Sequence, residues 1–378
     1  MTRTRDETLA WIDPAWNWPS EITELLERVC AACRRPEVHS AVLTGSTARG
    51  ELAIERTAEG IELRSDVELY VVASDPARAR LALEPDLRAI EAEVAGAWPA
   101  FHIDVACMTL QRFERLEPWI RNFELRANGK TVAGIDCLER APVVGLDSLD
   151  WQELNEVALW RMLGTVARLP CAWLRGERAL GLEERHALAR CLLDATTWAC
   201  PGFGVLLPSF RARVEWWSEP GSIPDPEARA LPSAELLGAC FAARSDSGAL
   251  PDGEELFASV AATWDAIHRI VSGETPSAHR GAGRGFRRVD GLRRARAAWR
   301  VLPRHREHTL GTLTEGPFRV AARRAHALLL EARALRDTPV ATGIRSWNAL
   351  RAGLAAYMDD ALGRREWSRH LPAEDCTQ

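Results

Sequence analysis

The sequence predicts an α+β protein in which an N-terminal α/β domain with a mixed sheet is followed by an α-helical domain. Three short apolar runs, at residues 41–43, 67–72 and 101–108, have the length of strands, and other stretches of the same region show helical spacing. Farther along the chain, apolar residues recur at helical spacing between breaks that are rich in proline and glycine. We therefore expect one domain over residues 1–145 and a helical domain over residues 146–378.

The remaining elements of the first domain follow from local signals. A helix is expected over residues 20–33, because this stretch begins with a serine after a proline and carries apolar residues at helical spacing. A second helix is expected over residues 76–94, between the second and third apolar runs. Residues 129–134 have the pattern of one more short strand.

Composition favours a folded protein without a membrane segment. The 378 residues are 47% hydrophobic and 27% charged, which allows a sizeable core and argues against disorder. No stretch approaches the roughly 20 apolar residues of a membrane helix, and the N-terminus leads into no apolar signal segment, so we expect a cytoplasmic protein. The nine cysteines are scattered, which does not indicate a disulfide framework. Cys30 and Cys33 form a CxxC pair, but no second pair follows at zinc-site spacing.

The most informative segment follows the first predicted strand. Gly45 comes directly after the apolar run, Ser46 adds a hydroxyl donor, Arg49 adds a positive charge and Gly50 closes the turn. Because glycine has no side chain, backbone amides at such a turn can approach a polyphosphate closely. The segment is therefore predicted to bind phosphate groups, with the alternative that Arg49 only holds the loop through a salt bridge.

Three carboxylates lie on the next two predicted strands. Asp66 and Glu68 are two positions apart and so face the same side of their strand, and Asp104 has a corresponding position on the next strand. If the two strands are neighbours, the three carboxylates converge and raise one another's pKa values, a conflict that a divalent cation removes. Magnesium is the expected ion, because it takes oxygen ligands and favours sites that also hold substrate phosphates. His102 shares a face with Asp104 and is interpreted as an ordinary edge histidine.

This order of motifs resembles the polymerase-beta-like nucleotidyltransferase superfamily. The signature of that superfamily is an apolar strand that ends in Gly-Ser or Gly-Gly, then an Asp-x-Asp or Asp-x-Glu pair, and a third carboxylate on a later strand. The matching residues here are Gly45, Ser46, Asp66, Glu68 and Asp104. The resemblance covers about residues 20–140. Beyond them only the general plan matches, in which a helical domain follows the catalytic domain, as in aminoglycoside-type nucleotidyltransferases.

Two departures from the family pattern stand out. Ser46 and Asp66 are twenty positions apart, which is longer than the compact pattern, and the extra residues 51–64 are predicted to form a hairpin that turns at Glu59-Gly60. The second ligand position holds glutamate rather than aspartate, which keeps the charge but adds one methylene group.

The resemblance implies an enzyme that transfers a nucleoside monophosphate from a nucleoside triphosphate (NTP) to an acceptor hydroxyl and releases pyrophosphate. Asp66 and Glu68 would bind two magnesium ions, and Asp104 would complete one metal site and help to deprotonate the acceptor. Gly45 and Ser46 would hold the phosphates. The helical domain would select the acceptor, for which a small molecule is the first choice.

Other functions stay open at this point. The acceptor could be a tRNA end or a protein, and the fold could serve as a non-catalytic nucleotide-binding scaffold, although a degenerate scaffold would be expected to have lost a carboxylate. Residues 280–306 hold ten arginines and could bind RNA, but a solvated helix face is favoured. The net charge of −5 argues mildly against a long nucleic acid as the partner.

Overall fold

The computed structural model of the chain describes residues 11–57, 60–99, 101–166, 168–223 and 231–272, together with short helical pieces between residues 324 and 360. The chain divides into two compact units. The first unit comprises Met1–Asp150, Leu207–Ala212 and Ala242–Ala249, and the second comprises the remainder. Local sequence patterns do not indicate the two short segments that return to the first unit. The domain boundary predicted after residue 145 stays a prediction.

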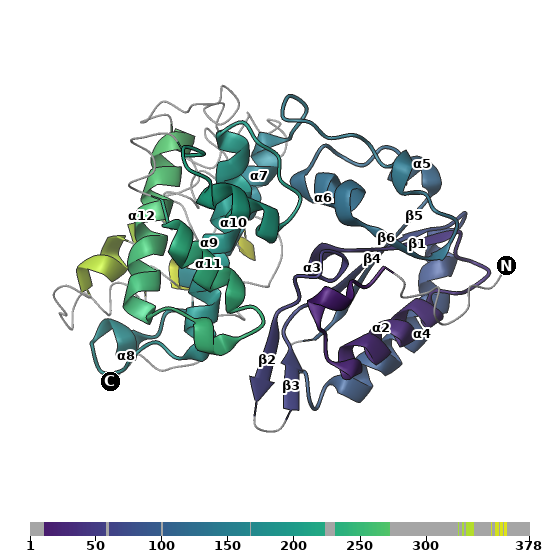
Figure 1. Cartoon of the computed structure of the whole chain (residues 1–378), viewed down its shortest axis with the longest axis horizontal. Helices are drawn as coiled ribbons and strands as arrows, with labels where there is room; N and C mark the ends of the chain where they lie inside the picture. Colours follow the sequence, from purple (N-terminus) through teal and green to yellow (C-terminus); the bar gives the residue numbers. More distant parts are fainter. Residues whose placement is uncertain are drawn as a thin grey trace. The chain divides into compact units, whose positions relative to one another are not determined.

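A mixed four-stranded sheet forms the centre of the first unit (Figure 1). Its strand order is β5-β4-β1-β6, with the bounds β1 Ser40–Thr44, β4 Val67–Val72, β5 Ile103–Met108 and β6 Lys130–Gly134. Strand β4 runs parallel to β5, whereas β1 is antiparallel to both β4 and β6. The three strands predicted from the apolar runs, and the fourth predicted over residues 129–134, are therefore confirmed.

Strand β1 is buried on both faces of the sheet, as expected of an inner strand. Ala41 and Leu43 belong to a large apolar core on one face, and Val42 packs on the other face with Phe113 and Leu125. Strand side chains alternate between faces, so an unbroken apolar run such as this one is stable only between two covered faces. The second face is covered by α5 Leu110–Phe113 and α6 Ile120–Asn128.

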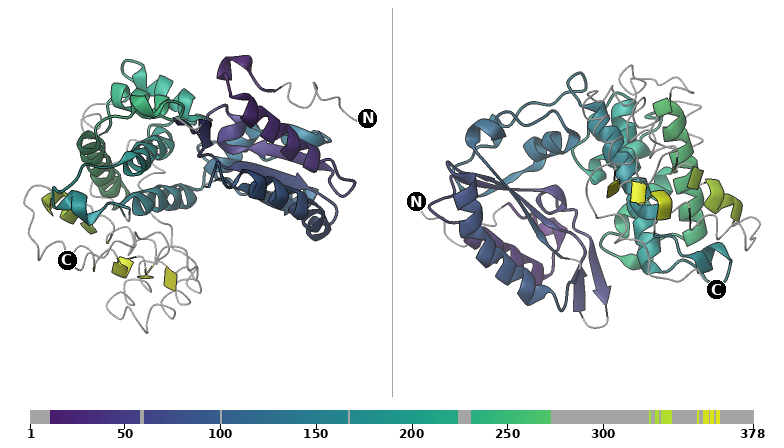
Figure 2. Two further views of the ribbon diagram at one scale, coloured as in Figure 1. Left: turned by 90° about the horizontal axis from the view of Figure 1, so that it is seen from below. Right: turned by 180° about the vertical axis from the view of Figure 1, so that it is seen from behind.

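Helices α2 Ser20–Ala32 and α4 Pro76–Val94 cover the first face and lie side by side (Figures 1 and 2). Helix α2 begins directly after Pro19 and buries residues such as Leu26 and Val29 at helical spacing. Helix α4 begins at a proline, and the carboxylate of Asp75 accepts hydrogen bonds from two amides of its first turn. Both predicted helices are confirmed.

A hairpin lies between the loop at Gly45 and the start of β4, as predicted. Strands β2 Ile54–Thr57 and β3 Gly60–Leu63 pair with each other in antiparallel register, with Thr57 opposite Gly60. Gly60 has a positive φ of 140°, a conformation that favours glycine at the turn. The hairpin forms a separate two-stranded sheet, so the long spacing between Ser46 and Asp66 adds no strand to the central sheet.

The second unit is helical in the part of it that the structure describes, which confirms the α+β class. Its longest helices pack against one another, because α9 contacts both α7 and α12. The helices assigned from α7 on are α7 Trp151–Val166, α8 Cys171–Leu174, α9 Leu182–Gly202, α10 Phe210–Ser218, α11 Ala234–Ala242 and α12 Gly253–Ser272. The arginine-rich residues 280–306 lie outside the described residues.

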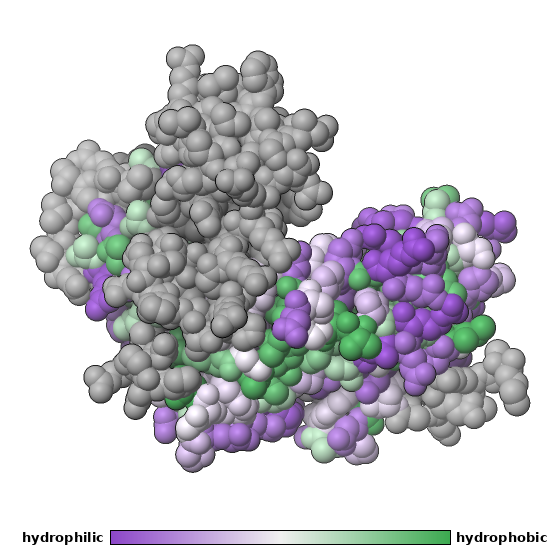
Figure 3. Space-filling view, turned by 90° about the horizontal axis from the view of Figure 1, so that it is seen from above, coloured by the Kyte–Doolittle hydropathy of each residue, from purple (hydrophilic) through white to green (hydrophobic). Residues whose placement is uncertain are grey.

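The surface mixes polar and apolar side chains. Figure 3 shows hydrophilic and hydrophobic residues interspersed over the described part of one face. Exposed large apolar residues include Leu81 on α4 and Ile135 directly after β6. Among the described helices, none combines the length and the apolar content that crossing a membrane requires.

Candidate functional site

The three predicted carboxylates lie where strands β4 and β5 begin. Val67 and Leu69 are fully or almost fully buried, at 0% and 1% exposure, whereas Glu68 between them is exposed. Glu68 lies directly opposite Asp104 in the parallel pairing of β4 with β5. The predicted alternation of β4, and the adjacency of the two strands on which convergence of the carboxylates depended, are both present.

The starts of β4 and β5 meet the end of β1, because β1 is antiparallel to β4. Thr44, the last residue of β1, lies opposite Glu68, so the loop that follows β1 reaches the carboxylates. That loop is the short helix α3 Gly45–Ala48. The hydroxyl of Thr47 donates a hydrogen bond of 3.3 Å to the backbone oxygen of Asp66, which ties the loop to the start of β4.

His102 lies between two of the carboxylates. Its Nδ1 is 3.3 Å from Oδ1 of Asp66, and its Nε2 is 3.4 Å from Oδ2 of Asp104. One ligand atom from each of these three residues lies within 4.8 Å of the others. Their side chains are 38%, 50% and 67% exposed in the order Asp66, His102 and Asp104, so a solute can reach all three.

Glu68 lies beside this cluster with its carboxyl group packed against the glycine of the loop. A Cβ atom added at Gly45 would approach Cδ and Oε2 of Glu68 to 2.9 Å. Although the residue is partly open to solvent, protein surrounds its carboxyl group, and this desolvation raises its pKa. The guanidinium of Arg49 lowers the pKa, but the negative charges of Asp66 and Asp104 raise it again, and the net shift is upward.

The two glycines of the loop are required for different reasons. Gly45 has a φ of +69° and would meet Glu68 if it carried a side chain, whereas Gly50 has a φ of +70° and packs against the ring of Trp16. The glycine at position 50 thus serves packing against Trp16. Ser46 follows Gly45 in α3 and is half-buried, and its role at a phosphate stays a prediction.

Arg49 takes the salt-bridge alternative that the sequence left open. Its Nε lies 2.9 Å from Oε2 of Glu51, and its Nη1 lies 3.0 Å from Oε2 of Glu124. Burial by itself lowers the pKa of the Arg49 guanidinium, but the carboxylates of Glu124 and Glu51 outweigh it and raise the pKa. Its side chain is only 8% exposed, so it holds the loop from within the protein.

Glu51 extends this buried cluster to the two segments that return to the first unit. Its carboxylate accepts hydrogen bonds of 3.2 Å and 2.7 Å from the backbone amides of Phe210 and Arg211, at the start of α10. Its backbone oxygen accepts a bond of 3.0 Å from Nε of Arg244. The side chain of Glu51 has no exposed area, and all of these partners belong to the first compact unit.

A pocket of about 310 Å³ adjoins the cluster of Asp66, His102 and Asp104. It lies between α4 and β5, with the buried Leu83 and Leu87 among its lining residues. Its polar lining includes His102 and Asp104, and α4 contributes two arginines and two glutamates, namely Arg80, Arg88, Glu84 and Glu91. A pocket of this size is in the range that binds small molecules.

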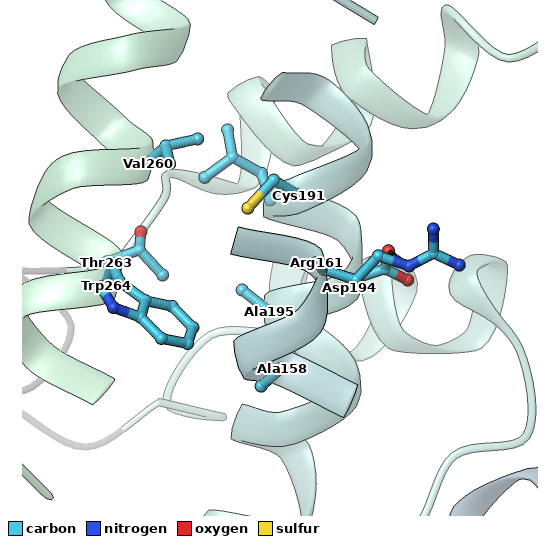
Figure 4. A pocket seen from close by; sticks show the side chains of 9 residues that line it. Ala158, Arg161, Cys191, Asp194, Ala195, Val260, Thr263 and Trp264 are labelled. Atoms are coloured by element: carbon cyan, nitrogen blue, oxygen red, sulfur yellow. Dashed lines mark ion pairs between the residues drawn. The ribbon is translucent and has the colours of Figure 1, made fainter. Parts of the chain in front are cut away.

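A second pocket, inside the helical unit, is not a comparable site. It lies between α7, α9 and α12, with Ala158, Cys191 and Val260 among its lining residues (Figure 4). Its volume is about 10 Å³, room for on the order of one water molecule. The charged residues at its border, Arg161 and Asp194, are paired with each other at 2.9 Å. This pocket is therefore a small gap in the packing of the three helices.

The CxxC pair is part of the core. Cys30 and Cys33 are 2% and 0% exposed, and burial raises the pKa of each thiol to about 12. A thiol with that pKa stays protonated near neutral pH, whereas metal binding and redox exchange require the thiolate. The structure thus supports a packing role for Cys30 and Cys33.

No family model matches the chain, and no curated protein and no solved structure matches it either. The N-terminal unit with its mixed sheet, followed by a helical region, is the part of the resemblance that the structure shows. Membership in the nucleotidyltransferase superfamily stays a prediction from the motifs.

Two residues of this region make contacts that local sequence patterns do not indicate. His102 was interpreted as an edge histidine, but its ring contacts both Asp66 and Asp104. The contact follows from the parallel register of β4 and β5, which brings residue 102 beside residue 66 and which the sequence alone does not specify. Glu51 offered no signal either, since its partners at residues 210 and 211 are distant in the sequence.

Proposed function

We propose that the protein is a metal-dependent nucleotidyltransferase, which transfers a nucleoside monophosphate from an NTP to an acceptor hydroxyl and releases pyrophosphate. One observation carries the proposal: Glu68 and Asp104 lie opposite each other on neighbouring parallel strands, with Asp66 beside them and the loop at Gly45 against Glu68. This is the arrangement that the motif order implies for the superfamily it resembles.

The three carboxylates of the site fit a divalent cation such as magnesium. Three carboxylates stand close enough that Asp66 and Asp104 raise the pKa of Glu68, and a divalent cation would relieve this repulsion. Asp66 and Glu68 would hold two magnesium ions, and Asp104 would complete one of the two sites. When bound, magnesium neutralises charge on the triphosphate and on the phosphoryl group in transfer.

The other residues of the site bind and orient the substrates. The Ser46 hydroxyl and the backbone amides of the turn at Gly45 would hold the terminal phosphates of the NTP. Asp104 is the most exposed of the three clustered side chains and would accept the proton of the acceptor hydroxyl. Arg49 would act through Glu68, whose pKa it lowers, and its contact with phosphate stays a prediction.

The pocket between α4 and β5 supports a small-molecule acceptor. It is about 310 Å³ in volume and reaches Asp104, the proposed base. The role predicted for the helical domain in acceptor selection stays a prediction.

The test is transfer itself. The protein is incubated with each isotopically labelled NTP and magnesium, and candidate acceptors are screened by mass spectrometry for an added nucleotide. Asp104→Asn should slow single-turnover transfer by at least about 100-fold, because loss of a general base typically lowers the rate by roughly 10²–10⁴-fold. Asp147→Asn, the same change at an exposed position of the first unit, is the matched control and should leave the rate unchanged.

The two alternatives predict other results. Labelling of tRNA or of a protein, with no labelled small molecule, would assign the acceptor to a macromolecule. Binding of NTP with no transfer to any acceptor class would favour a non-catalytic scaffold. A folded Asp104→Asn variant with near-normal turnover would remove the three-carboxylate mechanism.

A further inference from the structure

We propose that His102 is a direct metal ligand, so that Asp66, His102 and Asp104 form a site with one nitrogen and two oxygen donors that prefers a divalent transition-metal ion to magnesium. The inference concerns the metal at the site of the proposed function and rests on that function only for the role of the ion. The set of ligands is different from the three carboxylates that the sequence motifs imply.

The peptide group that follows His102 is held in place at both of its polar atoms. Its carbonyl oxygen accepts a hydrogen bond of 3.1 Å from the amide of Val67, which is part of the β4–β5 pairing. The next amide, that of Ile103, donates a bond of 2.6 Å to Oε1 of Glu91 on α4. Both polar atoms of the peptide group that joins His102 to Ile103 are therefore bonded, which fixes the backbone on the side where β5 begins, beside the two carboxylates.

The ligand atoms converge to nearly the separation that one ion requires. Two atoms that bind the same ion at about 2.1 Å are about 3.0–4.2 Å apart in octahedral geometry. In the described structure, one atom from each of Asp66, His102 and Asp104 lies within 4.8 Å of the others. Nδ1 of His102 faces Asp66 and Nε2 faces Asp104, so an ion shared by all three residues requires these exposed side chains to turn until one ring nitrogen and both carboxylates point at it.

Glu68 is not a member of this convergent set. Its carboxyl group packs against the loop at Gly45, and the group of residues with converging ligand atoms is Asp66, His102 and Asp104. Glu68 therefore stands at one side of the cluster, where it can bind a second ion or the metal of a bound nucleotide. The closest three-ligand geometry uses the histidine in place of the glutamate.

The donor set decides which ions bind. Magnesium takes oxygen ligands and gives up its water reluctantly, whereas imidazole nitrogen suits transition-metal ions. Manganese accepts both carboxylate and imidazole, and zinc binds each at about 2.0–2.2 Å. A site with one nitrogen and two oxygens thus favours these ions. The pocket of about 310 Å³ beside His102 and Asp104 leaves room for water and substrate oxygens to complete the coordination.

The experiment measures Mn²⁺ binding to the full chain without nucleotide. Loss of the free Mn²⁺ signal in electron paramagnetic resonance gives the affinity, and electron spin echo modulation detects a nitrogen bound to the ion. Competition with Mg²⁺ gives the preference between the two. We expect one Mn²⁺ ion with a nitrogen signal that changes when histidine is labelled with ¹⁵N, and weaker binding of Mg²⁺.

His102→Gln should abolish the nitrogen signal and lower Mn²⁺ affinity by at least about 10-fold, since even loss of an outer-sphere partner of a metal ligand lowers affinity by about 10–100-fold. Its effect on Mg²⁺ affinity should be smaller. The matched control is His39→Gln, an exposed histidine of the first unit that bonds to Ser74, and it should keep the nitrogen signal.

Two results would overturn the inference: bound Mn²⁺ without a nitrogen signal, or a nitrogen signal that survives in His102→Gln. Absence of Mn²⁺ binding would do the same. These outcomes are separable from failure of the proposed function, because nitrogen-bound Mn²⁺ in a protein that transfers no nucleotide leaves the inference standing. Conversely, normal transfer with Mg²⁺ by His102→Gln, together with no nitrogen signal in the wild type, leaves only the proposed function.

Discussion

Two clusters of charged side chains lie in the first compact unit, and they differ in burial and in charge balance. In the cluster of Arg49, Glu51 and Glu124, the side chains are 8%, 0% and 14% exposed, and both carboxylates contact the guanidinium. In the cluster of Asp66, His102 and Asp104, the side chains are 38%, 50% and 67% exposed, and two carboxylates share one histidine.

The difference separates a structural role from a chemical one. Removing one partner of a buried ion pair leaves the other charge without compensation and is strongly destabilising. The charged groups around Glu51 therefore have to stay paired with one another. The cluster around His102 keeps negative charge open to solvent, where it can bind a cation and a substrate. In the sequence, each cluster includes acidic residues just after a strand or at its start. The burial and the charge balance seen in the structure distinguish the two clusters.

The largest expected effect is on stability, from the buried cluster. Glu51→Gln keeps the shape of the side chain but removes the charge that compensates Arg49 and accepts the amides of Phe210 and Arg211. We expect a loss of about 3–5 kcal/mol in the free energy of unfolding of the first unit. Hydrogen–deuterium exchange of residues 40–72 in a urea series would measure it.

Asp104→Asn supplies the comparison for that measurement. It also removes a carboxylate, but from the exposed cluster, where it relieves repulsion with Asp66 and Glu68. Its free energy of unfolding should be equal to the wild-type value or slightly higher. If Glu51→Gln and Asp104→Asn have the same stability, the distinction between the two clusters is wrong.

An intermediate effect is expected where the loop meets the exposed cluster. Gly45→Ala places a side chain at a φ of +69° and brings its Cβ to 2.9 Å from the carboxyl group of Glu68. A left-handed conformation is unfavourable by roughly 1–2 kcal/mol for an alanine, so the first unit should lose about that much stability. Displacement of Glu68 should also weaken Mg²⁺-dependent NTP binding, which calorimetry would measure.

Gly96→Ala is the matched control for the loop variant. Gly96 belongs to the first unit, and a Cβ added there meets no atom within 4 Å. Unchanged NTP binding in Gly45→Ala, with and without Mg²⁺, would show that neither the glycine nor the position of Glu68 contributes to the nucleotide site.

Patterns of short range predicted most of the fold. The alternation of Val67, Glu68 and Leu69 fixed the face of each side chain, because strand geometry repeats every two residues. The unbroken apolar run at residues 41–43 indicated a strand, and the structure buries its side chains on both faces of the sheet. These inferences need only the neighbours along the chain, and the structure confirms them.

Contacts that depend on chain topology escaped prediction. Whether His102 meets Asp66 depends on β4 and β5 being parallel and in register, and an offset of one residue would have turned the ring to the other face. The burial of Glu51 depends on residues 207–212 and 242–249 returning to the first unit, which local spacing does not reveal. The site is therefore less predictable from sequence than the sheet that carries it.

The smallest expected effect concerns the ionisation of Glu68. Its pKa in the folded protein lies above the ordinary value of 4.5, chiefly through desolvation, with repulsion from Asp66 and Asp104 adding to the rise. The folded state therefore binds this proton more tightly than the unfolded state does. The associated stabilisation is fully present below pH 4.5 and is lost as the pH rises through the pKa of the folded protein. Ionised Glu68 thus destabilises the metal-free fold at neutral pH.

Glu68→Gln should accordingly be more stable than the wild type at pH 7 in the presence of EDTA, and this advantage should shrink as the pH falls toward 4. Glu93→Gln is the control of opposite sign, because a hydrogen bond from Arg28 lowers the pKa of the exposed Glu93. Its stability relative to the wild type should therefore be lower at pH 7 and recover toward pH 4. Denaturant titrations of the three proteins at a series of pH values measure both differences. A stability difference between Glu68→Gln and wild type that does not vary with pH would show that folding does not raise the pKa of Glu68, so that desolvation and the charges of Asp66 and Asp104 have no net effect on it.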